Sequence, residues 1–113
     1  MARVEITIAL REEVIRVFKR RSGDIFRRMK ALEENPSMGK PVGHAGTTVI
    51  KELKWDSFRF YCIADGHVIK FGSKEELQNL LIKFVTMSDK KTQQKTIEEI
   101  KSILLKMGAD GFT

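Results

Sequence analysis

The most strand-like part of the chain is the segment VIKELKWDSFRFYCIADGHVIKF, residues 49–71. It divides into three runs rich in β-branched and aromatic residues, at 49–54, 58–64 and 67–71. The polar pairs Asp56-Ser57 and Asp65-Gly66 separate these runs, and an Asp-Gly pair between apolar runs is a strong hairpin signal. The segment therefore predicts an antiparallel meander of three strands.

A strand and two helices are predicted before this meander. Residues 4–9 alternate as an opening strand, and from Leu10 to Leu32 the apolar residues recur at helical spacing. Ser22-Gly23 interrupts this pattern, and Asp24 is the predicted cap of the second helix. Asn35-Pro36 ends that helix, because the residue before a proline disfavours helical backbone angles. Residues 35–48 hold two prolines and three glycines and predict a loop.

After the meander, two capping-box patterns predict two further helices. The first opens at Ser73 and runs to about Leu80, and the second opens at Thr96. Residues 81–87 between them predict a last strand. The closing helix is expected to end at Gly108, with residues 109–113 frayed. Its predicted apolar face consists of Ile97, Ile100, Leu104 and Met107.

Together these elements predict one α+β domain over residues 1–113, because this length has room for a single core. An N-terminal strand and a helical hairpin are expected to pack on a small, mainly antiparallel sheet, followed by a C-terminal helix. The chain has no apolar run long enough to cross a membrane, and its first residues do not resemble a signal peptide. A cytoplasmic protein without a membrane partner is therefore expected.

The charge balance favours a polyanionic partner. Lys and Arg total 21 against 15 acidic residues, which gives a formal net charge of +6 and a pI near 9.6. Nucleic acid or an acidic protein would satisfy this charge. Cys62 is the only cysteine and lies in an apolar run, so we expect a buried, inert thiol and no disulfide within the chain. No spacing of metal ligands is present, and neither a metal nor another cofactor is predicted.

Arg59 is the leading candidate for a catalytic or binding residue. It interrupts the apolar run 58–63, where burying an unpaired charge would be costly. In one interpretation it projects from the sheet into a groove and binds a phosphate with two hydrogen bonds. In the other it lies on the solvent face and pairs with Glu52 on the neighbouring strand.

Four lysines could act with Arg59. Lys90 and Lys91 follow the last strand, where a loop could present them to a bound phosphate, or they could form a solvated pair at a helix entrance. Lys54 and Lys51 could add electrostatic attraction, or they could serve as edge-strand lysines that discourage aggregation.

Four further residues are candidates for contacting nucleic acid. Tyr61 could stack on a base, or could be a half-buried aromatic residue of the sheet. His44 lies in the glycine-rich loop and could turn towards a substrate. Arg20 and Arg27 belong to the densest basic stretch, the helical hairpin, which suits phosphate binding, although helix surfaces are commonly charged.

Three segments, taken in order, resemble the RelE/ParE toxin superfamily and its HigB-like branch. The first is Asn35-Pro36 followed by Gly39-Lys40-Pro41, after a helix. The second is Glu52-Leu53-Lys54 followed by Phe58-Arg59-Phe60-Tyr61. The third is Phe84-Val85 followed by Lys90-Lys91-Thr92-Gln93, before the closing helix. The resemblance covers roughly residues 3–107 and implies the RelE/ParE-like fold.

The resemblance also implies a function: the toxin of a type II toxin–antitoxin pair, acting as a ribosome-dependent mRNA endoribonuclease. In that metal-free chemistry the ribose 2′-hydroxyl attacks the adjacent phosphate and the 5′-oxygen leaves. Arg59, Lys54, Lys90 and Lys91 are the expected catalytic residues. The implied partners are mRNA on the ribosome and a small antitoxin protein.

Residues 72–80 look like an insertion between strands that the family usually joins more directly, and two further departures favour an alternative. The C-terminal region lacks the tyrosine of RelE-type nucleases, and Glu52 lies where some of them have a lysine. These differences fit a non-catalytic member of the same fold that binds RNA, or a protein target such as DNA gyrase.

Overall fold

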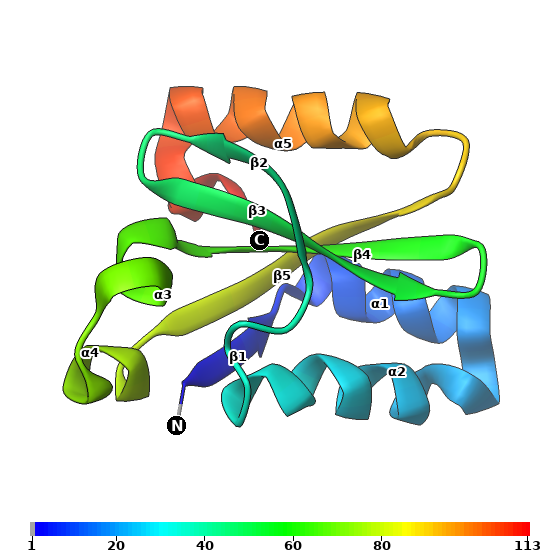
Figure 1. The fold of residues 1–113 in the computed structure, drawn as a ribbon. Helices are drawn as coiled ribbons and strands as arrows, with labels where there is room; N and C mark the ends of the chain where they lie inside the picture. Colours follow the sequence, from blue (N-terminus) through cyan, green and yellow to red (C-terminus); the bar gives the residue numbers. More distant parts are fainter. Residues whose placement is uncertain (1) are drawn as a thin grey trace.

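Residues 2–113 are described by the structure, a computed structural model. Their strands form a five-stranded sheet in the order β1-β5-β4-β3-β2, with β1 parallel to β5 and the other neighbours antiparallel. Helices cover both faces of this sheet (Figure 1), so the predicted α+β class is confirmed. The elements are β1 (Arg3–Ile6), α1 (Ile8–Phe18), α2 (Ser22–Lys30), β2 (Lys40–Ala45), β3 (Thr48–Trp55), β4 (Phe58–Asp65), α3 (Gly66–Phe71), α4 (Lys74–Gln78), β5 (Leu81–Asp89) and α5 (Gln93–Met107).

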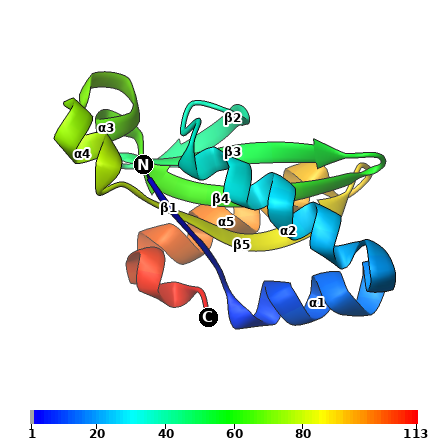
Figure 2. The same cartoon turned by 90° about the horizontal axis from the view of Figure 1, so that it is seen from below.

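The predicted helical hairpin is confirmed as α1 and α2, which lie side by side on one face of the sheet (Figure 2). The Thr7 hydroxyl accepts a hydrogen bond from Leu10 N and caps α1. This cap ends β1 at Ile6, earlier than the predicted residue 9. Asp24 does not cap α2 as predicted, because it lies inside the first turn of that helix and pairs with Arg27.

The core between the hairpin and the sheet is closely packed and apolar. Phe60 of β4 and Phe84 of β5 are fully buried against residues that include Val14 of α1 and Met29 of α2. Full burial of such a side chain contributes about 1.5–3 kcal/mol. Cys62 belongs to this cluster, which confirms the predicted buried thiol, and burial raises its pKa to about 12.

Helix α5 covers the opposite face of the sheet. Ile97 and Ile100 pack against a second cluster that holds Ile50 and Tyr61, and Leu104 is partly buried beside it. Met107, predicted on the same face, is 61% exposed. The predicted stop is confirmed, since Gly108 has a positive φ of 67° and ends the helix.

The start of α5 differs from the prediction. The helix begins at Gln93, ahead of the predicted Thr96, and the cap position Thr92 makes no side-chain capping bond. The preceding turn is instead held by Asp89, whose carboxylate accepts hydrogen bonds from Lys91 N, Thr92 N and the Thr92 hydroxyl. These bonds, with the backbone N–H of Thr92 first, lower the pKa of Asp89.

Residues 35–48 are not the predicted loop throughout. Residues 40–45 form β2, which pairs antiparallel with β3 through a register shift between Pro41 and Gly43. Proline and glycine are tolerated here because β2 is the edge strand and bears a bulge. The neighbouring strand β3 therefore determines the conformation of a segment that has weak strand propensity of its own.

The predicted third strand of the meander, residues 67–71, is helix α3. The Asp65 carboxylate accepts hydrogen bonds from His67 N and Val68 N, so Asp65-Gly66 opens a helix and not a hairpin. Strands β3 and β4 are confirmed, as is β5. The capping box at Ser73 is also confirmed, because the Ser73 and Glu76 side chains each bond the other residue's backbone N–H.

The last residues are held by hydrogen bonds and are not frayed as predicted. The Lys83 ammonium donates hydrogen bonds to Ala109 O at 3.1 Å and Phe112 O at 2.9 Å. Ile8 N, in the first turn of α1, donates to Thr113 O at 3.0 Å. The tail therefore joins the start of α1 to β5. No helix within residues 2–113 is both long and apolar enough to cross a membrane.

Candidate functional site

A groove of about 550 Å³ lies where the first turn of α5 approaches strands β3 and β4. Most of its charged lining residues are cationic, and we call it the basic groove. It is lined by Arg28, Met38, Gly39, Lys40, Glu52, Leu53, Lys54, Arg59 and Gln93. These residues come from α2, the segment before β2, β2 itself, β3, β4 and α5, so the tertiary structure assembles the groove from distant parts of the chain.

The register of the sheet places four of the charged side chains together. Lys40 of β2 lies opposite Glu52 of β3, and Lys54 of β3 lies opposite Arg59 of β4. Residues directly opposite each other in an antiparallel pair share one face of the sheet, as do residues two apart on one strand. Lys40, Glu52, Lys54 and Arg59 therefore all project from the same face, the one that α5 covers further along.

Arg59 lies at the floor of the groove in a buried ion pair. Its Nε lies 3.1 Å from Glu52 Oε1, and the two side chains are 7% and 8% exposed. Arg59 Nη1 also donates to Asp56 O at 3.1 Å and to Phe58 O at 3.0 Å. The predicted pairing with Glu52 is thus present, but the arginine is buried and does not lie on an open solvent face.

Glu52 is held from its other side by α5. Gln93 Nε2 donates to Glu52 Oε2 at 2.8 Å, so both carboxylate oxygens have partners. Buried charges are tolerated in proteins when they are paired and hydrogen-bonded in this way. The cluster of Arg59, Glu52 and Gln93 is consequently a preorganised feature of the folded chain.

The rim of the groove carries free cationic charge. Arg28, Lys40 and Lys54 are exposed, and no carboxylate within residues 2–113 lies within ion-pair distance of them. With Arg59 they make four cations against the single carboxylate of Glu52. The groove is therefore positively charged and able to attract a polyanion.

Lys90 and Lys91 do not line the groove. They lie exposed in the turn between β5 and α5, where the Lys91 amide donates to Asp89. In the sheet, Ser88 of β5 lies opposite Arg59 of β4. The turn that holds Lys90 and Lys91 therefore begins just beyond the floor of the groove. The two lysines extend the cationic surface beyond the groove at that end of the sheet.

Two predicted contact residues are buried, which corrects their assignment. Lys51 is 4% exposed and donates to Pro36 O at 2.7 Å, so it is neither an exposed edge lysine nor a source of surface attraction. Burial lowers its pKa. Tyr61 is fully buried with its hydroxyl 2.8 Å from Ser88 Oγ, and burial raises its pKa. It is therefore closed to a stacking base.

The remaining predicted residues are exposed but lie outside the groove. His44 is on the edge strand β2, Arg20 is in the turn between α1 and α2, and Arg27 pairs with Asp24. Arg28, one position after Arg27, lines the groove instead. The sequence interpretation missed Arg28, Lys40 and Gln93 as site residues, although Lys40 belongs to the Gly39-Lys40-Pro41 motif noted above.

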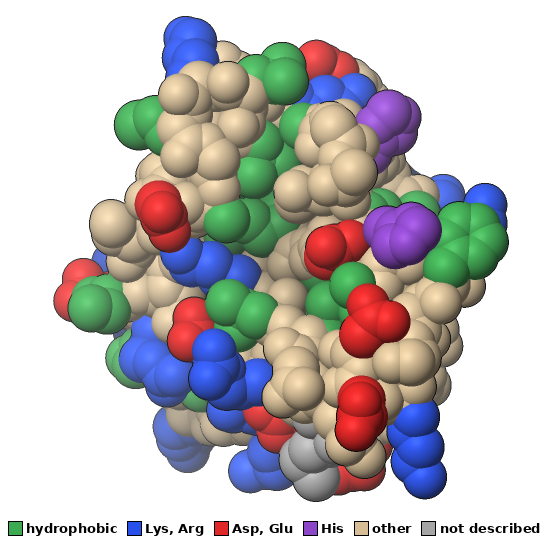
Figure 3. All heavy atoms as spheres, turned by 90° about the vertical axis from the view of Figure 1, so that its left-hand side faces the viewer, with side chains coloured by type: hydrophobic (Ala, Val, Ile, Leu, Met, Phe, Trp, Pro, Cys, Tyr) green, Lys and Arg blue, Asp and Glu red, His purple; other side chains and the backbone are tan. Residues whose placement is uncertain are grey.

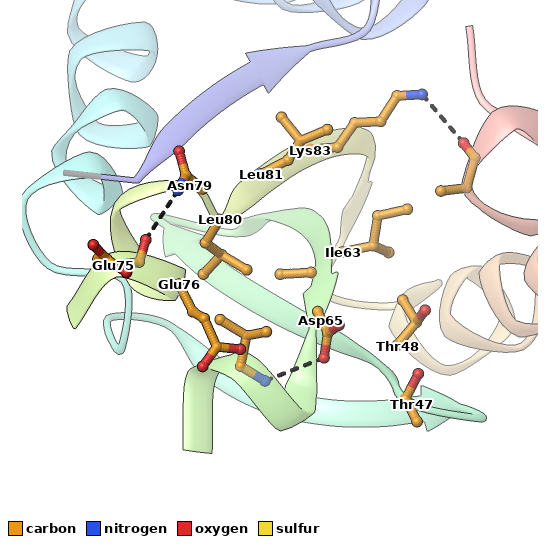
Figure 4. Close-up of a pocket in the computed structure, with 13 residues that line it drawn as sticks. Thr47, Thr48, Ile63, Asp65, Glu75, Glu76, Asn79, Leu80, Leu81 and Lys83 are labelled. Carbon is orange, nitrogen blue, oxygen red and sulfur yellow. Dashed lines mark hydrogen bonds between the residues drawn. The ribbon is translucent and has the colours of Figure 1, made fainter. Parts of the chain in front are cut away.

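A second cavity, of about 570 Å³, lies beyond the other end of α5, between that end and helices α3 and α4. Figure 3 shows this side of the molecule, where acidic side chains gather near a hollow with an apolar floor. Figure 4 shows Ile63, Leu80 and Leu81 lining the cavity, with Asp65, Glu75 and Glu76 around it. Asp65 and Glu76 already accept backbone hydrogen bonds as helix caps, so much of this acidity has a structural role.

No family model, no curated protein and no solved structure matches the chain. Within residues 2–113, no group of three or more His, Cys, Asp and Glu side chains is placed to hold a metal ion. The site must therefore be interpreted from its own residues, among which the basic groove has the clearest chemistry.

Proposed function

We propose that the chain is a RelE/ParE-type toxin of the HigB-like branch, whose basic groove binds single-stranded mRNA on the ribosome. The observation that carries this proposal is the groove itself, with Arg28, Lys40 and Lys54 at its rim and Arg59 at its floor. Cations that neutralise phosphates supply most of the sequence-independent affinity for nucleic acid.

The fold supports the same proposal. The RelE/ParE resemblance implies a leading strand, a helical hairpin, a mainly antiparallel sheet and a closing helix, and these elements occur here in that order, with the short helices α3 and α4 inserted between β4 and β5. Two of the three resembling segments, around Lys40 and around Lys54 and Arg59, meet in the groove. The third contributes Gln93 to the groove and places Lys90 and Lys91 beside it.

As an mRNA endoribonuclease, the protein would cleave by attack of the 2′-hydroxyl on the neighbouring phosphate, without a metal. Negative charge then increases on the phosphoryl oxygens, and preorganised cations stabilise it. Arg59 is preorganised by its ion pair with Glu52 and its hydrogen bonds to Asp56 O and Phe58 O, and Lys54 lies directly opposite it in the sheet. A small antitoxin protein would block the activity by covering the groove.

A non-catalytic RNA-binding or protein-binding member of the same fold is the second candidate. The observation in its favour is that Glu52 already neutralises Arg59, while Tyr61 is buried and Lys90 and Lys91 lie outside the groove. Such a protein would bind through its rim cations and leave the bound chain intact.

Primer extension on an mRNA in an active translation system tests the first candidate against the second. The informative variant is Lys40→Ala/Lys54→Ala, because both side chains are exposed and their loss leaves no buried charge unpaired. Arg59→Ala is a poorer test, since it would leave Glu52 buried without its cation. A matched control is Lys74→Ala/Lys106→Ala, which removes the same charge at exposed sites outside the groove.

Cuts within the codon at the ribosomal A site, made by the unmodified protein and the control but not by the groove variant, would establish the nuclease. RNA binding that depends on Lys40 and Lys54, without cuts, would establish the binding protein. Equal behaviour of the groove variant and its control would refute the basic groove as the RNA-binding site.

A further inference from the structure

We propose that Glu52 is a built-in restraint on the basic groove: its carboxylate partly neutralises Arg59 and so sets how strongly the groove holds a phosphate group. This inference rests on the proposed binding of RNA in the groove. It adds to that function a residue that lowers the affinity of the site.

The hydrogen bonds of Arg59 leave one part of its guanidinium available. A guanidinium has five N–H donors. Nη1 donates to Asp56 O and Phe58 O, and Nε lies 3.1 Å from Glu52 Oε1 in the ion pair. Nη2 has no hydrogen-bond partner within residues 2–113. It is also not fully buried, because Trp55 Nε1 is the only fully buried side-chain nitrogen or oxygen there that lacks a partner. Because Arg59 lines the groove, Nη2 is the donor that a phosphate entering the groove would meet.

A phosphate bound at Nη2 would be close to the negative charge of Glu52 as well as to the positive charge of Arg59. The carboxylate oxygen lies 3.1 Å from Nε, and both side chains are almost completely buried. Solvent and salt screen buried charges much less than exposed ones, so the negative charge of Glu52 opposes an anion bound at Nη2. The rim cations Arg28, Lys40 and Lys54 attract the phosphate chain, while Glu52 weakens its hold at the floor.

The structure offers a substitution that removes this charge with little other change. Glu52→Gln keeps the side-chain shape and can keep an amide oxygen beside Arg59 Nε. Gln93 can turn its amide so that its oxygen accepts from the new NH₂ group. Arg59 also remains bonded to Asp56 O and Phe58 O. The guanidinium should therefore keep its place and lose only its neutralising partner.

The test measures binding of a fluorescent single-stranded 2′-O-methyl RNA, which lacks the hydroxyl needed for cleavage. We expect Glu52→Gln to bind it on the order of tenfold more tightly than the unmodified protein at low salt. Its affinity should also fall more steeply with salt, because one more phosphate is effectively neutralised. The control Glu75→Gln makes the same charge change on α4, outside the groove, and should stay within about twofold of the unmodified protein.

A double-mutant cycle separates an effect through Arg59 from a general change of field. In an Arg59→Met background, where no guanidinium holds a phosphate at the floor, the further change Glu52→Gln should raise affinity less than it does in the unmodified protein. If Arg59→Met alone does not fold, the double variant is compared with Glu52→Gln and should lose the gain. A Glu52→Gln protein that is folded yet binds no more tightly than Glu75→Gln, or more weakly than the unmodified protein, would overturn the inference.

Pyrophosphate is the second probe, and it separates this inference from the proposed function. A gain for pyrophosphate in Glu52→Gln, with no RNA binding by any form, would support the restraint and refute RNA as the ligand. Normal RNA binding without any gain would refute the restraint and leave the function standing. In the unmodified protein, pyrophosphate should shift the Arg59 Nε–H resonance, and an unmoved resonance at saturation would also overturn the inference.

Discussion

Arg59 Nε lies 3.1 Å from Glu52 Oε1, and this contact joins β3 to β4 at the floor of the basic groove. A buried pair of this kind adds little net stability over apolar residues of similar size, but removing one partner leaves a charge in a poorly solvated place. The pair therefore has consequences for stability that can be measured apart from any ligand.

We predict that Arg59→Met lowers the free energy of unfolding by about 3–5 kcal/mol, because Glu52 then stays buried without a cation. The double variant Glu52→Gln/Arg59→Met should recover most of that loss, since it buries no charge. Urea unfolding followed by circular dichroism checks both values. A loss below about 1 kcal/mol for the single variant would contradict the burial of the pair.

Lys51 should make stability depend on pH in the alkaline range. Burial lowers its pKa in the folded state below the ordinary value of 10.5. Between these two pKa values the unfolded chain binds more protons than the folded one, so stability rises with pH. We predict that the unmodified protein gains stability relative to Lys51→Met as the pH rises towards 10.5, by up to about 1.4 kcal/mol per unit of pKa shift. Urea unfolding of both proteins at several pH values measures this difference, and parallel curves would refute it.

Cys62 should be unreactive while the protein is folded. Its side chain is 1% exposed, and burial raises the pKa of the thiol to about 12. A thiol dye at about pH 8 should label it only through opening of the core, about 10³-fold or more slowly than in the denatured chain. The raised pKa also means that stability falls as pH rises above 9.0 towards 12, a decline that Cys62→Ala should reduce. Rapid labelling of the native protein would show that this part of the core opens freely.

The attachment of the C-terminal tail to the sheet should depend on Lys83. Its ammonium bonds to Ala109 O and Phe112 O, next to the bond from Ile8 N to Thr113 O. We predict that Lys83→Met lowers the free energy of unfolding by about 1 kcal/mol and speeds hydrogen exchange of the Ile8 amide. The Thr7 amide, which bonds to Phe84 O, serves as an internal reference and should change less. Equal protection of Ile8 in both proteins would show that the tail is held by other contacts.

Much of the fold was predictable because it depends on local interactions. Strands β3 and β4 follow from β-branched and aromatic runs, and α4 follows from a capping box between Ser73 and Glu76. The apolar stripe that includes Val14 and Met29 predicts the helical hairpin, and these residues are indeed buried. Such signals come from residues that are close in sequence, so they can be recognised without knowing the tertiary structure.

The site was less predictable, because its residues meet only through strand register and helix packing. Arg59 stands out in the sequence as a charge in an apolar run, and Glu52 is its alternative partner there. Arg28 and Gln93, however, come from helices on opposite faces of the sheet, and no local pattern connects them to Arg59. Lys51 and Lys54 looked equivalent in sequence, yet one is buried and the other exposed, because they are three residues apart on a strand whose side chains alternate between faces.

The sequence by itself thus determined the α+β class, the helical hairpin, the central strands and the excess of positive charge, since propensity, periodicity, capping and composition need no distant contact. Only the tertiary structure decided that residues 40–45 form an edge strand, that Asp65 caps a helix, and that the tail is bonded to Lys83. It also decided that Glu52 neutralises Arg59 inside a basic groove. Each of these features depends on contacts between residues that are distant in sequence. Buried backbone groups and charges need partners, and only the complete fold determines which partners lie within reach.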